Sequence, residues 1–279
     1  MTIAVTAATG QLGRLAIAAL QARGHTPIAL ARDPARAADI GVPVRAFDYF
    51  TADAAALAGV DVLVLISSND FNDRTGQHAR VIAAAKAAGV GRIVYTSILK
   101  GAASPMILVQ DHIVTEADLH ASGLPVTILR NGWYTENYAG SLGGAIAAGA
   151  MVGTAAEALL STAARADYAQ AIAVVAIENG HAGQTYELAG DAAHTLADMA
   201  AEVSRQTGKP LPYVDMPADA YKALLVSFGL PDMLVTALAD ADTHAKAGYL
   251  FDDSKTLSRL IGRPTTPMAV TVAAAVASL

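Results

Sequence analysis

The sequence predicts an α/β protein with a doubly wound parallel sheet and a smaller, mainly helical C-terminal lobe. In the first 130 residues, short β-branched runs alternate with helical patterns, which is typical of βαβ units. Most of these runs are almost wholly apolar, as expected of strands that helices cover on both faces. From residue 195 onward the patterns are mainly helical. Together these features predict a Rossmann fold.

The predicted elements follow one another in the order strand, helix, strand. The clearest strand includes the five apolar residues from Val62 to Ile66. We expect strands at residues 3–6, 26–31, 42–47, 60–66, 92–97 and 126–130, and helices at residues 11–22, 52–57, 76–88 and 107–122. The first domain is predicted to span residues 1–132, together with a strand near residues 184–190 that returns to its sheet. The strand pattern itself covers residues 184–189. Residues 133–279 then form mainly the second lobe.

Composition narrows the class of protein. The chain has 279 residues, is 53% hydrophobic and contains no cysteine, which excludes disulfides, thiolate zinc sites and a cysteine nucleophile, and no metal site is expected. A formal charge of −6 without a basic cluster opposes nucleic-acid binding. The apolar stretches at 141–156 and 265–279 are shorter than the roughly 20 residues of a membrane span and are predicted to be Ala-rich helices. We expect a cytoplasmic protein without a membrane partner. The sequence leaves open whether the chain forms a homodimer.

A glycine-rich turn joins the first predicted strand to the first predicted helix. Gly10 would let the backbone approach a pyrophosphate, and Gly13 would let the helix pack closely on the sheet, while the helix N-terminus offers N–H groups to the anion. The first position of this G-x-x-G-x-x-G spacing is Ala7, which we expect to hold a negative φ. The turn predicts a bound dinucleotide, with contacts from Thr6, Ala8, Thr9, Gly10, Gln11, Leu12 and Gly13.

The end of the second predicted strand indicates which dinucleotide binds. An acidic residue there would bind the ribose 2'-hydroxyl, whereas an arginine would accept a 2'-phosphate. Arg32 follows this strand directly, so the sequence favours NADPH (NADP) over NADH. Asp33 is either a further contact or the N-cap of a short helix that begins at Pro34, and Arg36 is either a second phosphate contact or a solvated surface charge.

Other cofactor contacts are expected where polar residues directly follow apolar strands, because ligands of such sheets bind outside the carboxyl ends of the strands. Serine and aspartate are also ordinary turn residues, so each position has a structural alternative. The predicted contacts are Asp48, Tyr49, Ser67, Ser68, Ser97 and Asn131.

The usual proton relay of short-chain dehydrogenases, a tyrosine followed four residues later by a lysine, does not occur in this sequence. His112 and Glu116 stand on the helix where that pair would lie, and they either relay a proton or simply share a helix surface. A quinone accepts hydride with little need for a positioned acid, so binding and orientation could supply most of the rate. The missing relay therefore favours quinone reduction over ketone reduction.

Five segments carry a resemblance to a known family. They are the opening TAATGQLGR, ARDPAR after the second predicted strand, LRNGWYTENY from Leu129, and LFDDSKTL with IGRPTT near the C-terminus. These segments resemble the atypical short-chain dehydrogenases of the NmrA-like group, and within it the bacterial NAD(P)H:quinone oxidoreductases of type 2. The likeness extends over nearly the whole chain.

The resemblance implies a flavin-free enzyme that binds NADPH on a Rossmann fold and reduces quinones in a cleft between two lobes. It places the segment from Asn131 to Tyr138 beside the nicotinamide, with cofactor contacts from Asn131, Gly132, Trp133 and Tyr134. The catalytic candidates are Asn131 and Tyr134 of this segment and His112 of the predicted helix. Trp133 and Tyr134 either form an aromatic wall for the quinone or pack as interior aromatics. Reduction of ketones or triphenylmethane dyes, and a non-catalytic NADP(H) sensor with a regulatory partner, are the alternatives.

Overall fold

A computed structural model describes all residues from Met1 to Leu279, and they form two compact units. Unit 1 contains residues 1–101, 111–131 and 166–186, and unit 2 contains residues 102–110, 132–165 and 187–279. The expected boundary at residue 132 is therefore too simple. The chain leaves unit 1 near that residue but returns for residues 166–186, most of which form helix α6, Arg165–Ile177.

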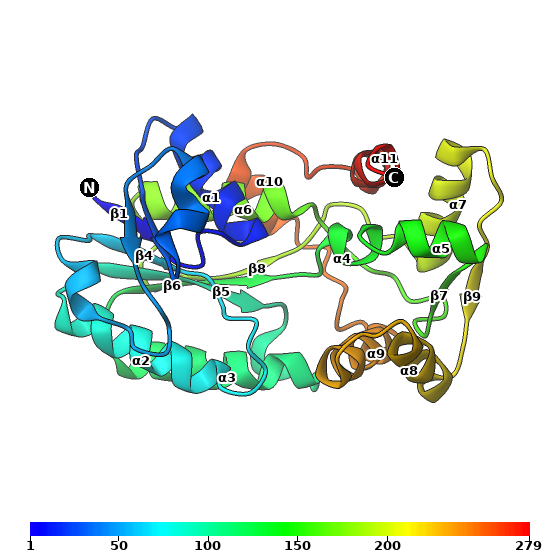
Figure 1. Ribbon diagram of the computed structural model, residues 1–279, viewed down its shortest axis with the longest axis horizontal. Helices are drawn as coiled ribbons and strands as arrows, with labels where there is room; N and C mark the ends of the chain where they lie inside the picture. The colour runs from blue at the N-terminus through cyan, green and yellow to red at the C-terminus, as the bar shows by residue number, and fades with distance from the viewer. The chain divides into compact units, whose positions relative to one another are not determined.

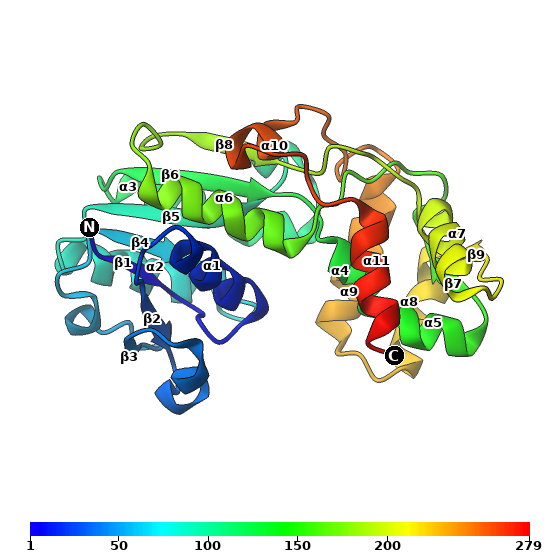
Figure 2. The ribbon, with the colours of Figure 1, turned by 90° about the horizontal axis from the view of Figure 1, so that it is seen from above.

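Unit 1 is built on a seven-stranded sheet in the order β3-β2-β1-β4-β5-β6-β8 (Figure 2). Neighbouring strands from β3 to β6 pair in parallel, with Ala4 opposite Ile28 on one side and Leu63 on the other. The strand order reverses between β1 and β4, which is where ligands of doubly wound folds bind. The strands are β1 Ile3–Val5, β2 Ile28–Ala31, β3 Val44–Ala46, β4 Val62–Leu65, β5 Arg92–Ile98, β6 Val126–Asn131 and β8 Thr185–Leu188.

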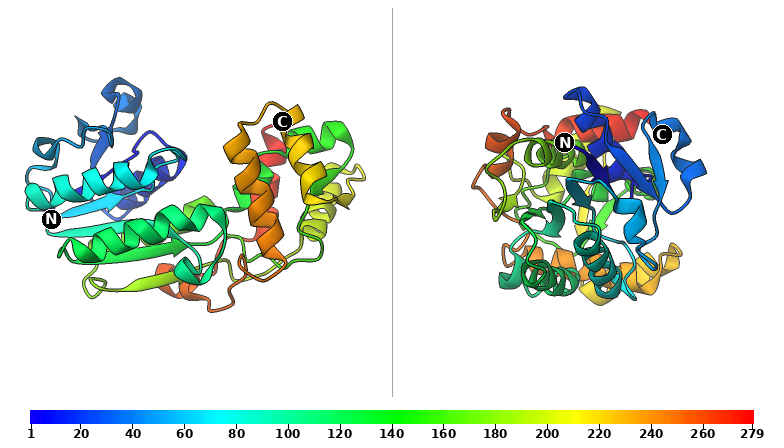
Figure 3. Two further views of the ribbon diagram at one scale, coloured as in Figure 1. Left: turned by 90° about the horizontal axis from the view of Figure 1, so that it is seen from below. Right: turned by 90° about the vertical axis from the view of Figure 1, so that its left-hand side faces the viewer.

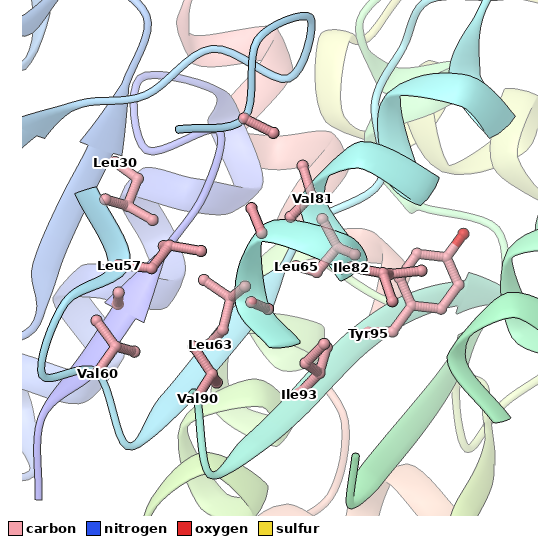
Figure 4. Close-up of a cluster of buried hydrophobic side chains, with 14 of the residues drawn as sticks. Leu30, Leu57, Val60, Leu63, Leu65, Val81, Ile82, Val90, Ile93 and Tyr95 are labelled. Carbon is pink, nitrogen blue, oxygen red and sulfur yellow. The ribbon is translucent and has the colours of Figure 1, made fainter. Parts of the chain in front are cut away.

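Helices cover both faces of this sheet, as the apolar strands require. Helices α1 and α6 lie on one face and α2 and α3 on the other (Figure 1 and Figure 3). Side chains of β4 and β5, such as Leu63, Leu65 and Ile93, pack with Val81 and Ile82 of α2 in one buried cluster (Figure 4). The helices are α1 Gln11–Ala22, α2 Arg74–Ala87 and α3 Ile107–Ala121, with short 3₁₀ helices at Pro34–Ile40, Ala54–Leu57 and Gly101–Ala103.

Unit 2 is mainly helical, as expected. Helix α11 contacts α7, α4 and α5, and α8 packs on α9. Two short strands pair in parallel, with Met151 opposite Tyr213. Its elements are α4 Thr135–Ala139, α5 Leu142–Ala148, β7 Met151–Gly153, α7 Leu196–Thr207, β9 Tyr213–Asp215, α8 Ala218–Ser227, α9 Asp232–Ala245, α10 Thr256–Ile261 and α11 Met268–Ala277. None of the helices offers the extended apolar stretch that a membrane span requires.

Three expectations about elements need correction. The helix expected at 52–57 is a 3₁₀ turn over Ala54–Leu57, and it follows Asp53, whose side chain accepts from the Ala55 N–H. The stretch 141–156 is not helical throughout, because α5 ends before Gly149, which takes a left-handed φ of 77°, and strand β7 follows. Helix α6 was not expected. Nine of its thirteen residues are buried, so its sequence has no polar face to mark the helical period.

Candidate functional site

The turn after β1 has the geometry that a dinucleotide requires. A Cβ atom at Gly13 would lie 2.3 Å from the Ala7 carbonyl oxygen, so only glycine lets α1 start this close to the turn. Gly10 is the N-cap of α1, and no side chain caps the helix or places an acidic group in its first turn. The N–H groups of Gln11, Leu12 and Gly13 are therefore left for an external acceptor, and they suit a pyrophosphate.

Ala7 departs from expectation, because it holds φ at +48° and not at a negative value. This is the left-handed region that glycine occupies without penalty, and an L-residue there costs about 1–2 kcal/mol. The Ala7 carbonyl accepts from the Gly10 N–H at 2.9 Å, which closes the turn. The alanine thus takes the same backbone conformation that a glycine would take, at an energetic cost.

Arg32 directly follows β2 and is exposed, and its guanidinium has no hydrogen bond or ion pair. It lines a hollow of about 250 Å³ at the ends of β2 and β3, together with Asp48 and Asp53. Both carboxylates are engaged in turns, where Asp48 accepts from the Phe50 N–H and Asp53 from the Ala55 N–H. Asp33 caps the following 3₁₀ helix by accepting from the Ala35 N–H, which is the structural alternative predicted for it.

Tyr49 and Thr6 interact with each other beneath the turn. The Tyr49 hydroxyl donates to the Ile66 carbonyl at 2.7 Å and forms a short hydrogen bond with Thr6 Oγ1. Thr6 is buried, and its hydroxyl also accepts from the Ile66 N–H at 3.0 Å. Burial raises the pKa of Tyr49. These two predicted cofactor contacts therefore join the ends of β1, β3 and β4.

The serines after β4 are likewise engaged by the protein. Ser68 donates its hydroxyl to Gln77 Oε1 at 2.6 Å, and its N–H donates to His78 Nε2 at 2.9 Å. His78 Nδ1 lies 2.9 Å from Thr115 Oγ1, which itself donates to the Asp111 carbonyl. Burial and the nearby Arg74 lower the pKa of His78 to about 3, so the ring stays neutral and carries its proton on Nδ1. The Ser67 N–H donates to Thr96 Oγ1.

The polar residues of β5 and α3 form two separate contacts. Ser97 Oγ donates to Glu116 Oε1 at 2.6 Å, and Arg130 of β6 donates to both oxygens of Glu116, at 3.0 and 2.6 Å. The single hydrogen bond of His112 joins its Nδ1 to the Tyr95 hydroxyl at 2.7 Å. Burial lowers the pKa of His112, so its ring is neutral. His112 and Glu116 share a helix, and each is hydrogen-bonded to a residue of β5 and not to the other.

The four predicted residues from Asn131 onward lie where the chain passes from unit 1 into unit 2. Asn131 is buried at the end of β6, and its carbonyl accepts from the Leu99 N–H. Gly132 donates its N–H to the Leu188 carbonyl. Trp133 is only 7% exposed, and its buried indole N–H has no acceptor. The Tyr134 ring is half-buried and carries the Arg165 guanidinium 4.7 Å from its centroid.

Several residues of these networks could not be assigned a role from the sequence. Arg14 and Asp39 form an ion pair beside the turn. His78, Tyr95 and Arg130 bond to Ser68, His112 and Glu116, respectively. Arg14 and Arg130 lie within the quoted motifs, but nothing in the sequence indicates their partners, which only the tertiary structure reveals. In unit 2 the buried Asp242 similarly accepts from the Tyr138 hydroxyl at 2.7 Å and from the Thr154 N–H.

A second hollow of the chain is not part of this arrangement. It measures about 840 Å³ and lies in unit 2, between α7 and the segment that leads into β9. It is a shallow groove with a mostly apolar lining, and it contains none of the predicted site residues. The candidate site is therefore the carboxyl edge of the unit 1 sheet, where free N–H groups and a free guanidinium stand at the ends of β1 and β2.

Comparisons with known proteins agree with this geometry. Residues 7–179 match a family described as NAD(P)H-binding. Quinone oxidoreductase 2 of Escherichia coli (strain K12) is 48% identical over 277 residues, which cover 97% of each chain. A crystal structure of the NADPH-dependent quinone oxidoreductase from Escherichia coli with NADPH has a TM-score of 0.93 and covers 98% of this chain and 99% of that one. Citrobacter triphenylmethane reductase with NADP(H) is 33% identical, with a TM-score of 0.91 and coverage of 98% and 99%.

Proposed function

Because the chain belongs to the NAD(P)H-binding family, we propose that it is an NADPH-dependent oxidoreductase that reduces a quinone by two electrons to the hydroquinone. The observation that carries this proposal is the 48% identity, over 97% of both chains, to a quinone oxidoreductase. The resemblance expected from the sequence motifs is thereby confirmed. Both the identity and the structural similarity include unit 2, so the likeness extends beyond the cofactor-binding half.

The residues at the carboxyl edge of unit 1 fit NADPH. The N–H groups of Gln11, Leu12 and Gly13 would hold the pyrophosphate, since a side chain at Gly13 would displace the turn. Arg32 would hold the 2'-phosphate, because its guanidinium is exposed and has no partner in the protein. When bound, NADPH supplies the hydride. Asn131 to Tyr134 would then lie beside the nicotinamide, as the family resemblance implies.

Arg32→Ala tests the cofactor assignment. A charge-assisted contact to phosphate contributes about 1.5–3 kcal/mol, so we expect the Kd for NADPH to rise at least about tenfold. The Kd for NADH should change little, because NADH lacks the 2'-phosphate. Fluorescence titration of both cofactors measures the two constants. Equal loss for both would mean that Arg32 does not meet the 2'-phosphate.

The proposed reaction needs no acid from the protein. A quinone that accepts one hydride becomes a hydroquinone monoanion, which takes its remaining proton from water. His112 is neutral, buried and hydrogen-bonded to Tyr95, so it is placed to pack α3 on β5. A general acid accelerates a reaction by about 10²–10⁴-fold, so its removal would lower the rate by a similar factor. We expect His112→Ala to keep quinone reduction within about tenfold of the unaltered rate; a larger loss with intact NADPH binding would restore His112 as the acid.

Two alternatives are tested by the acceptor itself. The 33% identity to a triphenylmethane reductase favours a dye as a second acceptor, and an NADP(H) sensor would accept no electrons at all. NADPH absorbance should be followed with benzoquinone, menadione, a panel of ketones and a triphenylmethane dye, alongside the affinities for NADP and NADPH. We expect the fastest oxidation with a quinone. Tight binding without oxidation by any acceptor would contradict the enzyme and favour the sensor.

The remaining parts of the proposal concern surroundings and assembly. We place the enzyme in the cytoplasm, since a chain without cysteine makes no use of an oxidising compartment. Its partner is the small acceptor, without nucleic acid or membrane. Light scattering of the purified chain tests whether it forms a homodimer.

A further inference from the structure

Arg14 joins two segments that the sequence treats as separate parts of the site. It is the fourth residue of α1, and its side chain is 40% exposed. Its guanidinium forms a two-pronged ion pair with Asp39, at 2.8 and 3.1 Å, and donates to the Arg36 carbonyl at 3.0 Å. Its Nε also donates to the Thr9 carbonyl, at 3.4 Å. Arg14 therefore ties the glycine turn to the 3₁₀ helix Pro34–Ile40, mainly through the contacts to that helix.

The segment that Arg14 holds carries the cations proposed for the 2'-phosphate. Arg32 precedes the helix Pro34–Ile40 and Arg36 lies within it, and neither guanidinium has a hydrogen bond or ion pair. Within this segment Asp33 caps the Ala35 N–H and Gly41 ends the helix in the left-handed region, while the fully buried Ala37 packs it on the protein. The ion pair with Asp39 is thus its side-chain connection to α1.

We propose that Arg14 is a positioning residue for NADPH selectivity. Through Asp39 and the Arg36 carbonyl it holds the 32–40 segment against the pyrophosphate turn, so that the guanidinium groups of Arg32 and Arg36 face the 2'-phosphate. This inference rests on the proposed binding of NADPH. It assigns Arg14 no contact with the cofactor, because four of its hydrogen bonds already go to the protein.

A fixed segment favours a doubly charged phosphate more than a hydroxyl. If the segment is free, binding must order it and bring two like charges together, and both costs reduce affinity. Loss of a bidentate exposed ion pair that holds a binding segment changes a binding constant by up to about fivefold. NADH has no group at that position, so its affinity should depend little on where the segment lies.

The test compares Arg14→Met and Asp39→Asn with the unaltered chain, using direct binding of NADPH and NADH by fluorescence titration. We expect each variant to raise the Kd for NADPH about fivefold and the Kd for NADH less than about twofold. Glu178→Gln is the matched control, because it removes another exposed ion pair of unit 1, with Arg23. It should change neither constant. Thermal unfolding of each variant shows that the fold is kept.

Asp39→Asn separates positioning from direct contact. If Arg14 instead bound the phosphate itself, releasing it from Asp39 would leave NADPH affinity unchanged or increase it, and that result would overturn the proposal. Equal weakening of NADPH and NADH would also overturn it, because Arg14 would then act only on the glycine turn. In a chain that already carries Arg32→Ala and Arg36→Ala, Arg14→Met should leave the ratio of the two constants unchanged.

Failure of the proposed function would give a different result from failure of the role of Arg14. An unaltered chain that bound neither cofactor, or both equally, would contradict NADPH selectivity itself before any variant is measured, and the role of Arg14 would fall with it. Selective NADPH binding by the unaltered chain, with no change in Arg14→Met, would contradict only the role of Arg14.

Discussion

The two halves of the sheet's carboxyl edge differ in how their polar groups are used. At the ends of β1 and β2, the first N–H groups of α1 and the guanidinium of Arg32 have no partner in the protein. At the ends of β4 and β5, Ser68 and Ser97 are hydrogen-bonded to side chains of α2 and α3. The first half is prepared for a ligand, whereas the second is already satisfied and stiffens the edge on which the ligand would lie. Substitutions in the second half should therefore change stability, and those in the first should change cofactor binding.

His78 gives the largest effect, and it appears as a pH dependence. Its folded pKa of about 3 lies below the unfolded value of 6.5, so the unfolded chain binds more protons between these values. Stability is full above pH 6.5 and falls as the pH drops towards 3, by on the order of 4 kcal/mol in total and about 2 kcal/mol by pH 5. Urea unfolding at pH 7 and pH 5 measures this.

His78→Gln should remove the part of that loss that His78 contributes, so that its pH dependence is flatter than that of the unaltered chain. His112, whose pKa burial also lowers, contributes a dependence in the same direction that remains in this variant. His120→Gln, at an exposed position of α3, serves as the control and should keep the full dependence. If the unaltered chain and His78→Gln lost stability equally, the contact with Ser68 would not hold the ring neutral.

Glu116→Gln comes next, at about 3 kcal/mol of lost stability, because it removes the carboxylate charge from a largely buried ion pair with Arg130. Urea unfolding measures the loss. Asp219→Asn, which breaks an exposed pair with Lys222, should cost less than about 0.5 kcal/mol. The Kd for NADPH should stay within about threefold, since Glu116 contacts the protein and not the proposed ligand. A stable Glu116→Gln variant that no longer bound NADPH would mean that Glu116 belongs to the part of the edge that binds the ligand.

Gly13→Ala should lower stability by about 2 kcal/mol and also weaken NADPH, because the new methyl must displace the Ala7 carbonyl. In this variant both the stability and the affinity for NADPH should fall. Gly144→Ala is the control, since its Cβ would meet nothing within 4 Å in α5, and it should stabilise the helix by up to about 1 kcal/mol. Unchanged NADPH affinity in Gly13→Ala would mean that the turn does not hold the pyrophosphate.

The same division explains how much could be predicted from the sequence. Helix α1 was expected at residues 11–22 and lies at Gln11–Ala22, and the predicted strands of the sheet lie within about two residues of their observed ends, because alternating apolar runs and a glycine turn are local signals. The half of the edge at the ends of β1 and β2 could be predicted, because Arg32 directly follows a strand and the glycine turn joins a strand to a helix. The partners in the other half could not, since Ser97 and Glu116 are joined only by the packing of α3 on the sheet. Strands β7 and β9 were missed because, unlike the equally short β1 and β3, they lie in parts of the chain that are Ala/Gly-rich or mainly helical in pattern.

Ala7→Gly gives the smallest effect and has the opposite sign. Releasing the left-handed alanine gains about 1–2 kcal/mol, but glycine makes the unfolded chain more flexible by about 0.4–1 kcal/mol, so we expect a net stabilisation of about 0.5 kcal/mol. Ala156→Gly, at a φ of +49° in unit 2, should gain a similar amount, whereas Ala145→Gly within α5 should lose about 1 kcal/mol. Chemical unfolding of the three variants side by side measures these differences. If Ala7→Gly were destabilised like Ala145→Gly, the turn after β1 would not hold its first residue in the left-handed region, and the free N–H groups of α1 would need another explanation.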